Sequence, residues 1–522
     1  MDNFHLRSPA SKRRASHPEA RHPFLGAYVD AFAPGHDSGQ SVAIGRHDLG
    51  IYRLNFVCRA HCKNLAAHRE VIEPAETTPS EYRTKPIASY FRSGDLKDLS
   101  NPVAGVLSAT TTEDATSLIT AKVSGFFVQY GEESHYIRAW GGHCDTSSLS
   151  MHVGLVEGIE RICCADPDPD EVLKMVPEGV RTVTPSDFGL DPDHWPLPNP
   201  VIGAWTLGVD LSNNNQVALP TRTVYFEARI DEPVYVQDSS NGCAVGGTDA
   251  EAQLYGLLEV IERDAFLLAW YGNLPLPVID QTTICDAESL DYLRRLRLVG
   301  RNIRFLDATV GISVPTVIVV CDTPSGGVCL GAGSHPSPER ALRSALVEAA
   351  SDFQVVEEHA DQRRTELQAM LADPFLVRTV EDHADLFGLP EARAWLTGWA
   401  AAESPAPTPV GDIGQPPVSL ASLARRDDAG DSVESDLEDT VRRIEEAGFS
   451  PIAVNVASTL SRRHGFSCFK AVVPGLLPLD FGWGRQRALK MERLAKRSRE
   501  YLEEHGYDSG SYFPHVFPHP FP

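Results

Sequence analysis

The sequence Gly256-Leu-Leu-Glu259-Val-Ile-Glu262-Arg263 has a close counterpart earlier in the chain, Gly154-Leu-Val-Glu157-Gly-Ile-Glu160-Arg161. The recurrence indicates two similar helices. Residues three apart share one face of a helix, so each string presents two carboxylates together, followed by an arginine. Four carboxylates that converge in one cleft repel each other unless positive charge lies between them. Mg²⁺ and the phosphates that it carries usually provide that charge. The repeated string therefore predicts a metal-phosphate site on two helices.

Apolar residues surround the second string and predict a largely buried helix. They are Leu254, Leu257, Leu258, Ile261, Ala265 and Leu268. Buried carboxylates must be paired, protonated or bound to metal. One alternative is a set of internal salt bridges with Arg263 as a partner. The recurrence of the string favours the metal site.

Two further features lie just before the second string. Glu251 falls within about 80° of Glu259 and Glu262 at helical spacing, which makes it a candidate ligand. It also completes a capping box, Thr248-Asp-Ala-Glu251, in which it would only cap a backbone N–H. The glycine-rich loop 239–247, with Ser240 and Asn241, precedes the helix, and its backbone N–H groups suit phosphate.

The composition limits the classes of protein that this chain can belong to. A length of 522 residues predicts two or three domains, and 42% hydrophobic with 23% charged residues is typical of soluble globular proteins. The net charge of −24 argues against nucleic-acid binding. No run of about 18 apolar residues indicates a membrane span. The N-terminus lacks the apolar core of a secretory signal.

The ten cysteines have irregular spacing and complete no four-ligand zinc set. They predict reduced thiols in a cytoplasmic protein.

Periodicity and turn residues predict the elements along the chain. Residues 126–130 and 136–140 are expected to form a hairpin. Further strands are expected at 221–226, 233–236, 316–321, 452–456 and 468–473, and helices at 338–358 and 438–448. Residues 1–23 are expected to be disordered, and 24–95 to form a small segment without an assigned role. Residues 402–436 are expected to be a flexible loop, and the prolines of the tail, 513–522, exclude helix and central strand.

The stretch from Ser240 to Ala265 resembles the YcaO family of ATP-dependent enzymes that activate backbone amides. Four other segments fit the same family: the first E-x-x-E-R string, 101–106, 341–348 and 473–476. The ending Pro518-His-Pro-Phe-Pro522 is similar to the P-x-P-x-P tail that marks the azoline-forming cyclodehydratases within the family.

The resemblance implies an α+β fold in which pseudo-repeated E-x-x-E helices pack on a mostly antiparallel sheet, with the catalytic domain spanning 96–522. It implies that a Cys, Ser or Thr side chain of a ribosomal precursor peptide attacks the preceding backbone carbonyl. ATP phosphorylates the resulting oxyanion, and phosphate leaves as a thiazoline or oxazoline forms.

The resemblance also implies roles for single residues. Glu157, Glu160, Glu259 and Glu262 would hold Mg²⁺ between ATP phosphates, and Glu251 would be another ligand. Arg263 would contact phosphate, and Ser240 and Asn241 would line the nucleotide site. The tail, with Pro518, Pro520 and Pro522, would thread toward the substrate site and order it.

The partners implied by the resemblance are the precursor peptide and a separate E1-like or leader-binding protein. A flavin-dependent azoline dehydrogenase and a second copy of the chain are further candidates. Two residues depart from the family pattern. Gly142-His143-Cys144 stands where the family usually has G-K-G, and Gly247 stands where it often has asparagine. These departures keep open a pseudoenzyme that binds peptide or partner without turnover. A second rival is the sister chemistry of thioamide or amidine formation, against which the proline-rich tail argues.

Overall fold

The computed structural model describes most of the chain from residue 119 onward. The described residues are 40–44, 51–55, 87–91, 99–100, 107, 109–112, 119–130, 135–190, 202–226, 228–232, 234–236, 239–396, 417–424 and 432–521. The predicted tail 1–23 and residues 101–106 lie outside them, as do Pro522 and most of 24–95. Within 24–95, β1 (Gln40–Ile44) pairs with β2 (Ile51–Asn55).

Three larger sheets carry the described fold, and they are antiparallel at every pair except one short parallel pair, β6 with β8. The first has the order β3 (Ala109–Thr112), β4 (Ala121–Tyr130), β5 (His135–Cys144). The second has the order β6 (Arg181–Thr182), β8 (Gln216–Pro220), β7 (Trp205–Asp210), β13 (Ile452–Asn455), β14 (Ser467–Val472), β9 (Cys243–Gly246). The third has the order β10 (Ile303–Asp307), β11 (Thr316–Asp322), β12 (Val328–Ser334).

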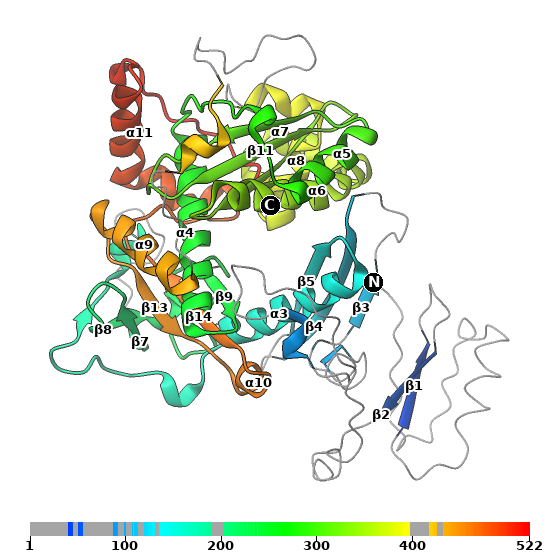
Figure 1. Cartoon of the computed structure of the whole chain (residues 1–522). Coiled ribbons are helices and arrows are strands. Elements are labelled where there is room, and N and C mark those ends of the chain that lie inside the picture. Colours follow the sequence, from blue (N-terminus) through cyan, green and yellow to red (C-terminus); the bar gives the residue numbers. More distant parts are fainter. Residues whose placement is uncertain are drawn as a thin grey trace.

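Helices pack on these sheets, and one long helix near the centre of the molecule, α4, approaches two of them (Figure 1). The longer helices are α3 (Ser147–Ala165), α4 (Asp249–Tyr271), α6 (Pro338–Gln362), α9 (Val433–Glu446) and α11 (Glu492–Glu504). The shorter ones are α5 (Ala287–Leu298), α7 (Arg364–Ala372), α8 (Val380–Phe387) and α10 (Thr459–Arg463). The predicted α+β class, with mostly antiparallel sheets, is confirmed.

Three strand-helix units repeat within this architecture. Each of α3, α4 and α6 follows a strand, β5, β9 and β12 respectively, and packs against it. The packing is close because glycines face the helices. A Cβ on Gly142 would lie 1.9 Å from the carbonyl oxygen of Ser150, and one on Gly331 would lie 2.3 Å from that of Ala345. A side chain at either position would force the helix away from its strand.

The interior is apolar along the second half of α4. Phe266 and Trp270 are fully buried and belong to the largest core cluster, which also contains Phe521 from the end of the chain. A helix this apolar on several sides is buried within the domain rather than lying on its surface. The carboxylates on α4 are therefore held beside a rigid core.

Most predicted elements are confirmed: β4, β5, β11, β13 and β14, with helices α6 and α9. The predicted strand at 221–226 is wrong, because a short 3-10 helix, Thr221–Thr223, occupies its first half. There the buried guanidinium of Arg222 donates to the carbonyls of Ala228 and Ile230, which bends the chain. The described residues 234–236 form no strand either, and the last part of the predicted loop 239–247 is strand β9.

Part of the expected flexible loop 402–436 is ordered: Leu420–Leu423 form a 3-10 helix, and α9 begins at Val433. No helix among the described residues is both long and apolar enough to cross a membrane. No disulfide links the eight cysteines of the described part of the chain.

Candidate nucleotide and metal site

Each of the three strand-helix units has a Ser or Thr at the N-cap position of its helix, and the side chains of two of these residues cap the helix. Thr146 and Thr248 each accept a hydrogen bond from the third residue of the helix that follows, and Ser337 occupies the same position before α6. Such side chains satisfy backbone N–H groups that the first turn leaves unpaired. A glutamate follows each cap eleven positions later (157 − 146, 259 − 248 and 348 − 337): Glu157, Glu259 and Glu348.

Each of these three glutamates accepts a backbone N–H from the strand or loop before its helix. The N–H of Gly141 donates to Glu157 Oε2 at 2.8 Å, and that of Gly242 donates to Glu259 Oε2 at 3.0 Å. The N–H of Ala332 donates to Glu348 Oε2 at 2.7 Å. Charge-assisted bonds of this kind fix carboxylate orientation. Three helices therefore present one oriented carboxylate each.

Each E-x-x-E string is followed by an arginine that pairs with glutamates of its own string. Arg161 pairs with Glu157 at 3.0 Å and donates to Ser240 Oγ at 2.7 Å, which ties α3 to the loop before α4. Arg263 lies 3.5 Å from Glu259 and 3.4 Å from Glu262. The alternative of internal salt bridges is thus partly correct, because both arginines pair with glutamates of their own string.

The two arginines do not neutralise all of the carboxylates. The pKa values of three of these carboxylates are raised, with burial as the largest cause. Burial raises the pKa of Glu160, and Glu259 and Glu157 add to the rise while Arg161 opposes it. Burial raises the pKa of Glu262 to about 7, with Arg263 opposing and Glu259 adding. Burial likewise raises the pKa of Glu348 to about 8. Carboxylates that are this unfavourable when ionised would be stabilised by a bound cation.

The loop before α4 offers a further oxygen to such a cation. Asn241 lies between Ser240, which Arg161 holds, and Gly242, which Glu259 holds. Its Oδ1 is buried and has no hydrogen-bond partner. Amide and carboxylate oxygens are the ligands that Mg²⁺ and its phosphate partners use. The donor set therefore fits Mg²⁺.

The described residues contain no group of three His, Cys, Asp or Glu side chains close enough to hold an ion by themselves. Mg²⁺ that is bound to ATP takes phosphate oxygens among its ligands.

Glu251 lies apart from this arrangement. Its Oε2 accepts the N–H of Gly247 at 3.1 Å, and its own N–H donates to Thr248 Oγ1 at 3.2 Å. The side chain is buried at the first turn of α4, two turns before Glu259. Its bond to the N–H of Gly247 is consistent with the capping alternative, and the ligand role stays a prediction. Gly247, one of the departures from the family pattern, supplies the capped amide.

The proline-rich tail ends against the same arginine. Residues 518–521 are buried, and the ring of Phe521 lies 3.9 Å from Arg263 Cζ. Phe521 also meets the ring of Phe266 edge-on, at 4.6 Å between centroids. Before that point the tail follows α4, where Trp270 Nε1 donates to the carbonyl of Phe517 at 3.2 Å. Pro518 and Pro520 are thus buried in the segment that leads to Phe521. Pro522 is outside the described residues.

A histidine pair fastens the tail to the rest of the domain. His383 stacks on His519 at 4.1 Å between ring centroids. Its Nε2 accepts the N–H of Gly482, so its Nδ1 carries the proton and donates to the carbonyl of His519 at 2.9 Å. Burial lowers the pKa of His383 to about 4, which keeps the ring neutral at pH 7.

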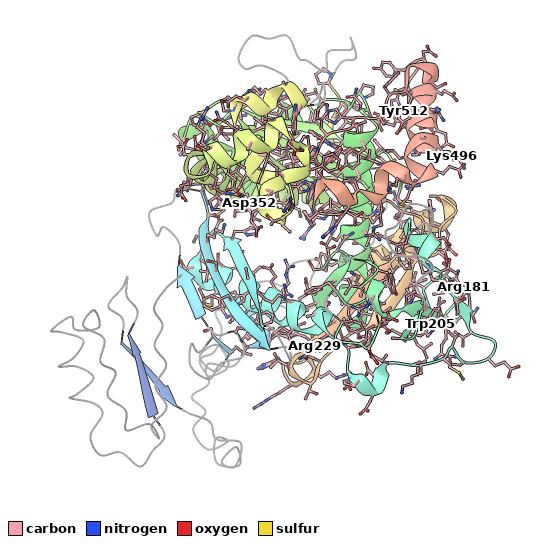
Figure 2. All side chains as sticks on the ribbon, turned by 180° about the vertical axis from the view of Figure 1, so that it is seen from behind. Arg181, Trp205, Arg229, Asp352, Lys496 and Tyr512 are labelled. Carbon is pink, nitrogen blue, oxygen red and sulfur yellow. The ribbon has the colours of Figure 1, made fainter. Side chains whose placement is uncertain are left out.

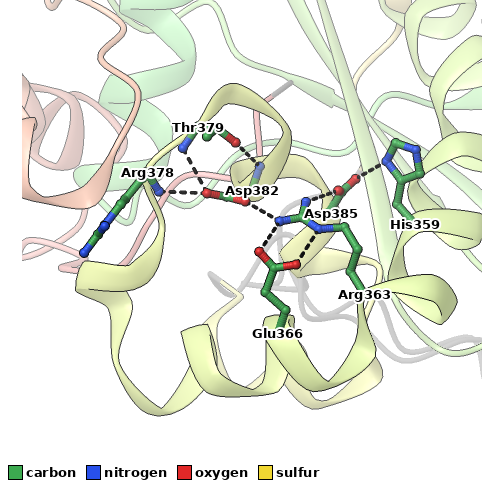
Figure 3. A network of polar contacts seen from close by, with 7 residues as sticks. All are labelled: His359, Arg363, Glu366, Arg378, Thr379, Asp382 and Asp385. Carbon is green, nitrogen blue, oxygen red and sulfur yellow. Dashed lines mark hydrogen bonds and ion pairs between the residues drawn. The ribbon is translucent and has the colours of Figure 1, made fainter. Parts of the chain in front are cut away.

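The helix that carries His383 is itself anchored by a polar network (Figure 3). Arg363, at the end of α6, pairs with Asp382 and Asp385 of α8 at 2.6 Å each, and with Glu366 at 2.9 Å. Asp382 also caps the start of α8 by accepting the N–H of Thr379. His383 lies between the two aspartates, so the network holds α8 in the position from which its histidine reaches the tail.

Sequence reasoning missed Glu348 and Arg161 as members of the site. Glu348 has no E-x-x-E partner, because Ser351 stands three positions later. Its signal was the spacing of eleven from a helix-capping residue, which it shares with Glu157 and Glu259. Arg161 was visible in the repeated string, but only the structure shows that it bonds to Ser240.

The chain belongs to the YcaO family. The family described as "YcaO cyclodehydratase, ATP- and Mg²⁺-binding" matches residues 141–477. The match contains all four predicted E-x-x-E glutamates and Glu348. ATP and Mg²⁺ are therefore the cofactors of the domain, and the site described above fits them.

Known proteins include one that is similar in sequence to part of this chain and two whose structures are similar in fold. An uncharacterised protein in the tfuA 3′ region of Rhizobium leguminosarum bv. trifolii is 29% identical over 239 residues, which cover 42% of this chain and 55% of that protein. The chain thus spans about half the length of that relative. A heterocyclase in complex with substrate and cofactor has a TM-score of 0.63 at 19% identity, over 95% of this chain and 67% of the other. The heterocyclase TruD has a TM-score of 0.51 at 19% identity, over 90% of this chain and 61% of the other. These two structures share the fold.

Proposed function

We propose that this chain is a peptide cyclodehydratase, which converts Cys, Ser or Thr residues of a ribosomal precursor peptide to thiazolines or oxazolines. In each catalytic cycle the side-chain sulfur or oxygen forms a bond to the carbonyl carbon of the preceding residue. The carbonyl oxygen then takes the γ-phosphoryl group of ATP and leaves as phosphate. The peptide thereby loses the elements of one water: its carbonyl oxygen leaves in the phosphate, and the protons of the attacking side chain and of the amide nitrogen pass to the phosphate and to solvent. ATP becomes ADP and this phosphate.

The observation that carries the proposal is the carboxylate cluster that two arginines only partly neutralise. Glu157, Glu160, Glu259 and Glu262 would hold Mg²⁺, and Glu348 would add a fifth carboxylate from α6. Phosphoryl transfer depends mainly on positioning and charge neutralisation, which such a cluster would provide through the metal. Ser240 and Asn241 would line the phosphate end of the nucleotide.

Arg263 would act at the boundary between nucleotide and peptide. It is paired with two glutamates on one side and covered by Phe521 on the other. A guanidinium matches phosphate oxygens in geometry, so Arg263 could hold the transferred group once Mg²⁺ takes over its glutamates. The position of the tail supports the azoline-forming reaction over thioamide or amidine formation, because the tail reaches this arginine.

The pseudoenzyme is the second candidate, and His143 is the observation that favours it. The residue stands where the family usually has lysine, and the loss of that charge would weaken phosphate binding. Precursor peptide and a separate E1-like or leader-binding protein remain the proposed partners in either case, with a flavin-dependent azoline dehydrogenase or a second copy of the chain as further ones.

The test is phosphate release from ATP by the purified chain, with its partner and precursor peptide, together with the mass of the peptide. Loss of one water mass per modified residue, abolished in Glu259→Gln and Glu262→Gln, would support cyclodehydration. Glu358→Gln, on the exposed side of α6, is the matched control. Sulfur incorporation without water loss would favour the thioamide rival. Peptide binding without any ATP turnover would overturn the proposal in favour of the pseudoenzyme.

A further inference from the structure

A lysine lies directly across the sheet from His143. In the antiparallel pair of β4 and β5, Lys122 is the register partner of His143, and Ser124 is the partner of Gly141. Residues that are directly opposite in such a pair project from the same face of the sheet, a few ångströms apart. Lys122 and His143 therefore lie beside each other on adjacent strands, next to the glycine whose N–H holds Glu157.

This pair projects from the face of the sheet that α3 does not cover. Gly142 points at α3, because a Cβ there would meet Ser150 and Gly154, and Val123 and Trp140 are buried on the same side. Side chains alternate along a strand, so Lys122 and His143 project from the opposite face. On that face, among the residues that the structure describes, a Cβ on Gly141 would meet only the carbonyl oxygen of Val123, at 3.6 Å.

Carboxylates from two helices act on His143. The pKa of His143 is lowered by burial, raised by Asp352 and Glu157, and lowered by Lys122. Asp352 is one turn after Glu348 on α6, so both carboxylates lie on the same side of that helix. Figure 2 places Asp352 at the edge of the helical layer next to the sheet of β3, β4 and β5. Lys122, His143, Glu157 and the face of α6 that carries Glu348 and Asp352 thus surround the space over Gly141.

We infer that Lys122, with His143 beside it, binds the phosphate end of the nucleotide and supplies the positive charge that the sequence lacks at position 143. The inference rests on the proposed function, because it uses the same site. A phosphate chain in the space over Gly141 would contact the ammonium group of Lys122 on one side. It would meet the Mg²⁺ held by the E-x-x-E glutamates on the other. The simpler role for Lys122 is as a counter-ion to Asp352 and Glu157, and that role requires no ligand.

The test compares the affinities of Lys122→Met for MgATP and for AMP, measured by calorimetry without peptide. A lost charged contact to phosphate weakens binding about 10-fold or more, so MgATP affinity should fall by that factor. AMP lacks the terminal phosphates, and its affinity should stay the same. Lys122→Arg should keep most of the MgATP affinity, and His143→Lys in the Lys122→Met background should restore part of it. Lys496→Met, on α11 far from Asp352 in Figure 2, is the control.

The melting temperature without nucleotide separates folding from binding, and it should be the same in all variants. Unchanged MgATP affinity in Lys122→Met would overturn the inference and leave the proposed function intact. Equal losses for MgATP and AMP would overturn it too, because a counter-ion role would disturb the whole site. No MgATP binding by the unmodified protein would overturn the proposed function, and the inference with it.

Discussion

The ring of Phe521 lies over the guanidinium of Arg263, 3.9 Å from Cζ to the ring centroid, while the same guanidinium faces Glu259 and Glu262. The last described residue of the chain thus covers a charged group of the E-x-x-E site. A cation over an aromatic face is stabilised by about 0.5–2 kcal/mol, and more when both groups are away from water. The tail is therefore in direct contact with the arginine of the second E-x-x-E string.

Two substitutions of Phe521 should separate the effect of losing the aromatic ring from the effect of losing buried side-chain volume. Phe521→Ala empties a buried position and should cost about 3 kcal/mol of unfolding free energy, the low end for buried aromatics, because a chain end can relax. Phe521→Leu keeps most of the apolar volume but loses the ring, so it should cost about 1 kcal/mol and reduce kcat several-fold. Denaturant unfolding and peptide-stimulated phosphate release measure these effects. Phe513→Ala, in the exposed part of the tail, is the control, and equal kcat in Phe521→Leu and the unmodified protein would contradict the role of the ring.

Glu348 should make the stability of the Mg²⁺-free protein depend on pH. Burial raises its pKa in the folded state to about 8, against 4.5 for an ordinary glutamate. The folded state therefore binds the proton more tightly, and the stability contribution is complete below pH 4.5 and lost as pH rises through 8. Gln at this position can still accept the N–H of Ala332 but cannot ionise. Glu348→Gln should thus be more stable than the unmodified protein at pH 8.5, by roughly 1–3 kcal/mol, and equal to it near pH 4.5.

Thermal unfolding in chelator across this pH range measures the difference. Glu358→Gln lies on the exposed side of the same helix and should show no such dependence. A constant difference between Glu348→Gln and the unmodified protein at all pH values would show that Glu348 does not titrate in this window.

The two candidate roles of Glu251 predict different responses to Mg²⁺. If it caps α4, Glu251→Gln can still accept the N–H of Gly247, so it should lower stability by only about 0.3–1 kcal/mol, through the lost charge at the helix N-terminus, and leave the increase in melting temperature caused by MgATP intact. Glu262→Gln should remove most of that increase, because a site ligand is lost. Melting temperatures with ATP and a series of Mg²⁺ concentrations distinguish the two variants. Equal loss of the MgATP effect in both would place Glu251 among the ligands.

His383 should control how firmly the tail is held. His383→Ala leaves the carbonyl of His519 and the N–H of Gly482 without their partner, at a cost of about 1–3 kcal/mol for each buried group. We expect faster amide hydrogen exchange in residues 515–521, measured by mass spectrometry, with little change in β13 or β14. His505→Ala, an exposed histidine on α11, is the matched control. Unchanged exchange in the tail would show that its core contacts hold it without His383.

Local patterns predicted several parts of the molecule correctly. The two E-x-x-E helices, the hairpin of β4 and β5, and the strands β11, β13 and β14 all follow from periodicity, because burial of one face dictates the spacing of apolar residues. The strand predicted at 221–226 is wrong for a physical reason. Its β-branched and aromatic residues favour a strand, but Arg222 is buried and bonds to carbonyls six and eight residues later. Such a contact is invisible to a local pattern.

The sequence by itself determined which residues can carry the chemistry. Four glutamates at helical spacing, two arginines, a glycine-rich loop and a proline-rich ending are local features, and helix geometry alone places each pair of carboxylates on one face. Only the tertiary structure decided which of them meet. It brought Glu348 of α6 into a third unit with the spacing of the first two, and it placed Phe521 on Arg263 and Lys122 opposite His143. These contacts join segments far apart in the chain. They form because burying the strand-helix units against one another leaves the charged faces of α3, α4 and α6 around a single site.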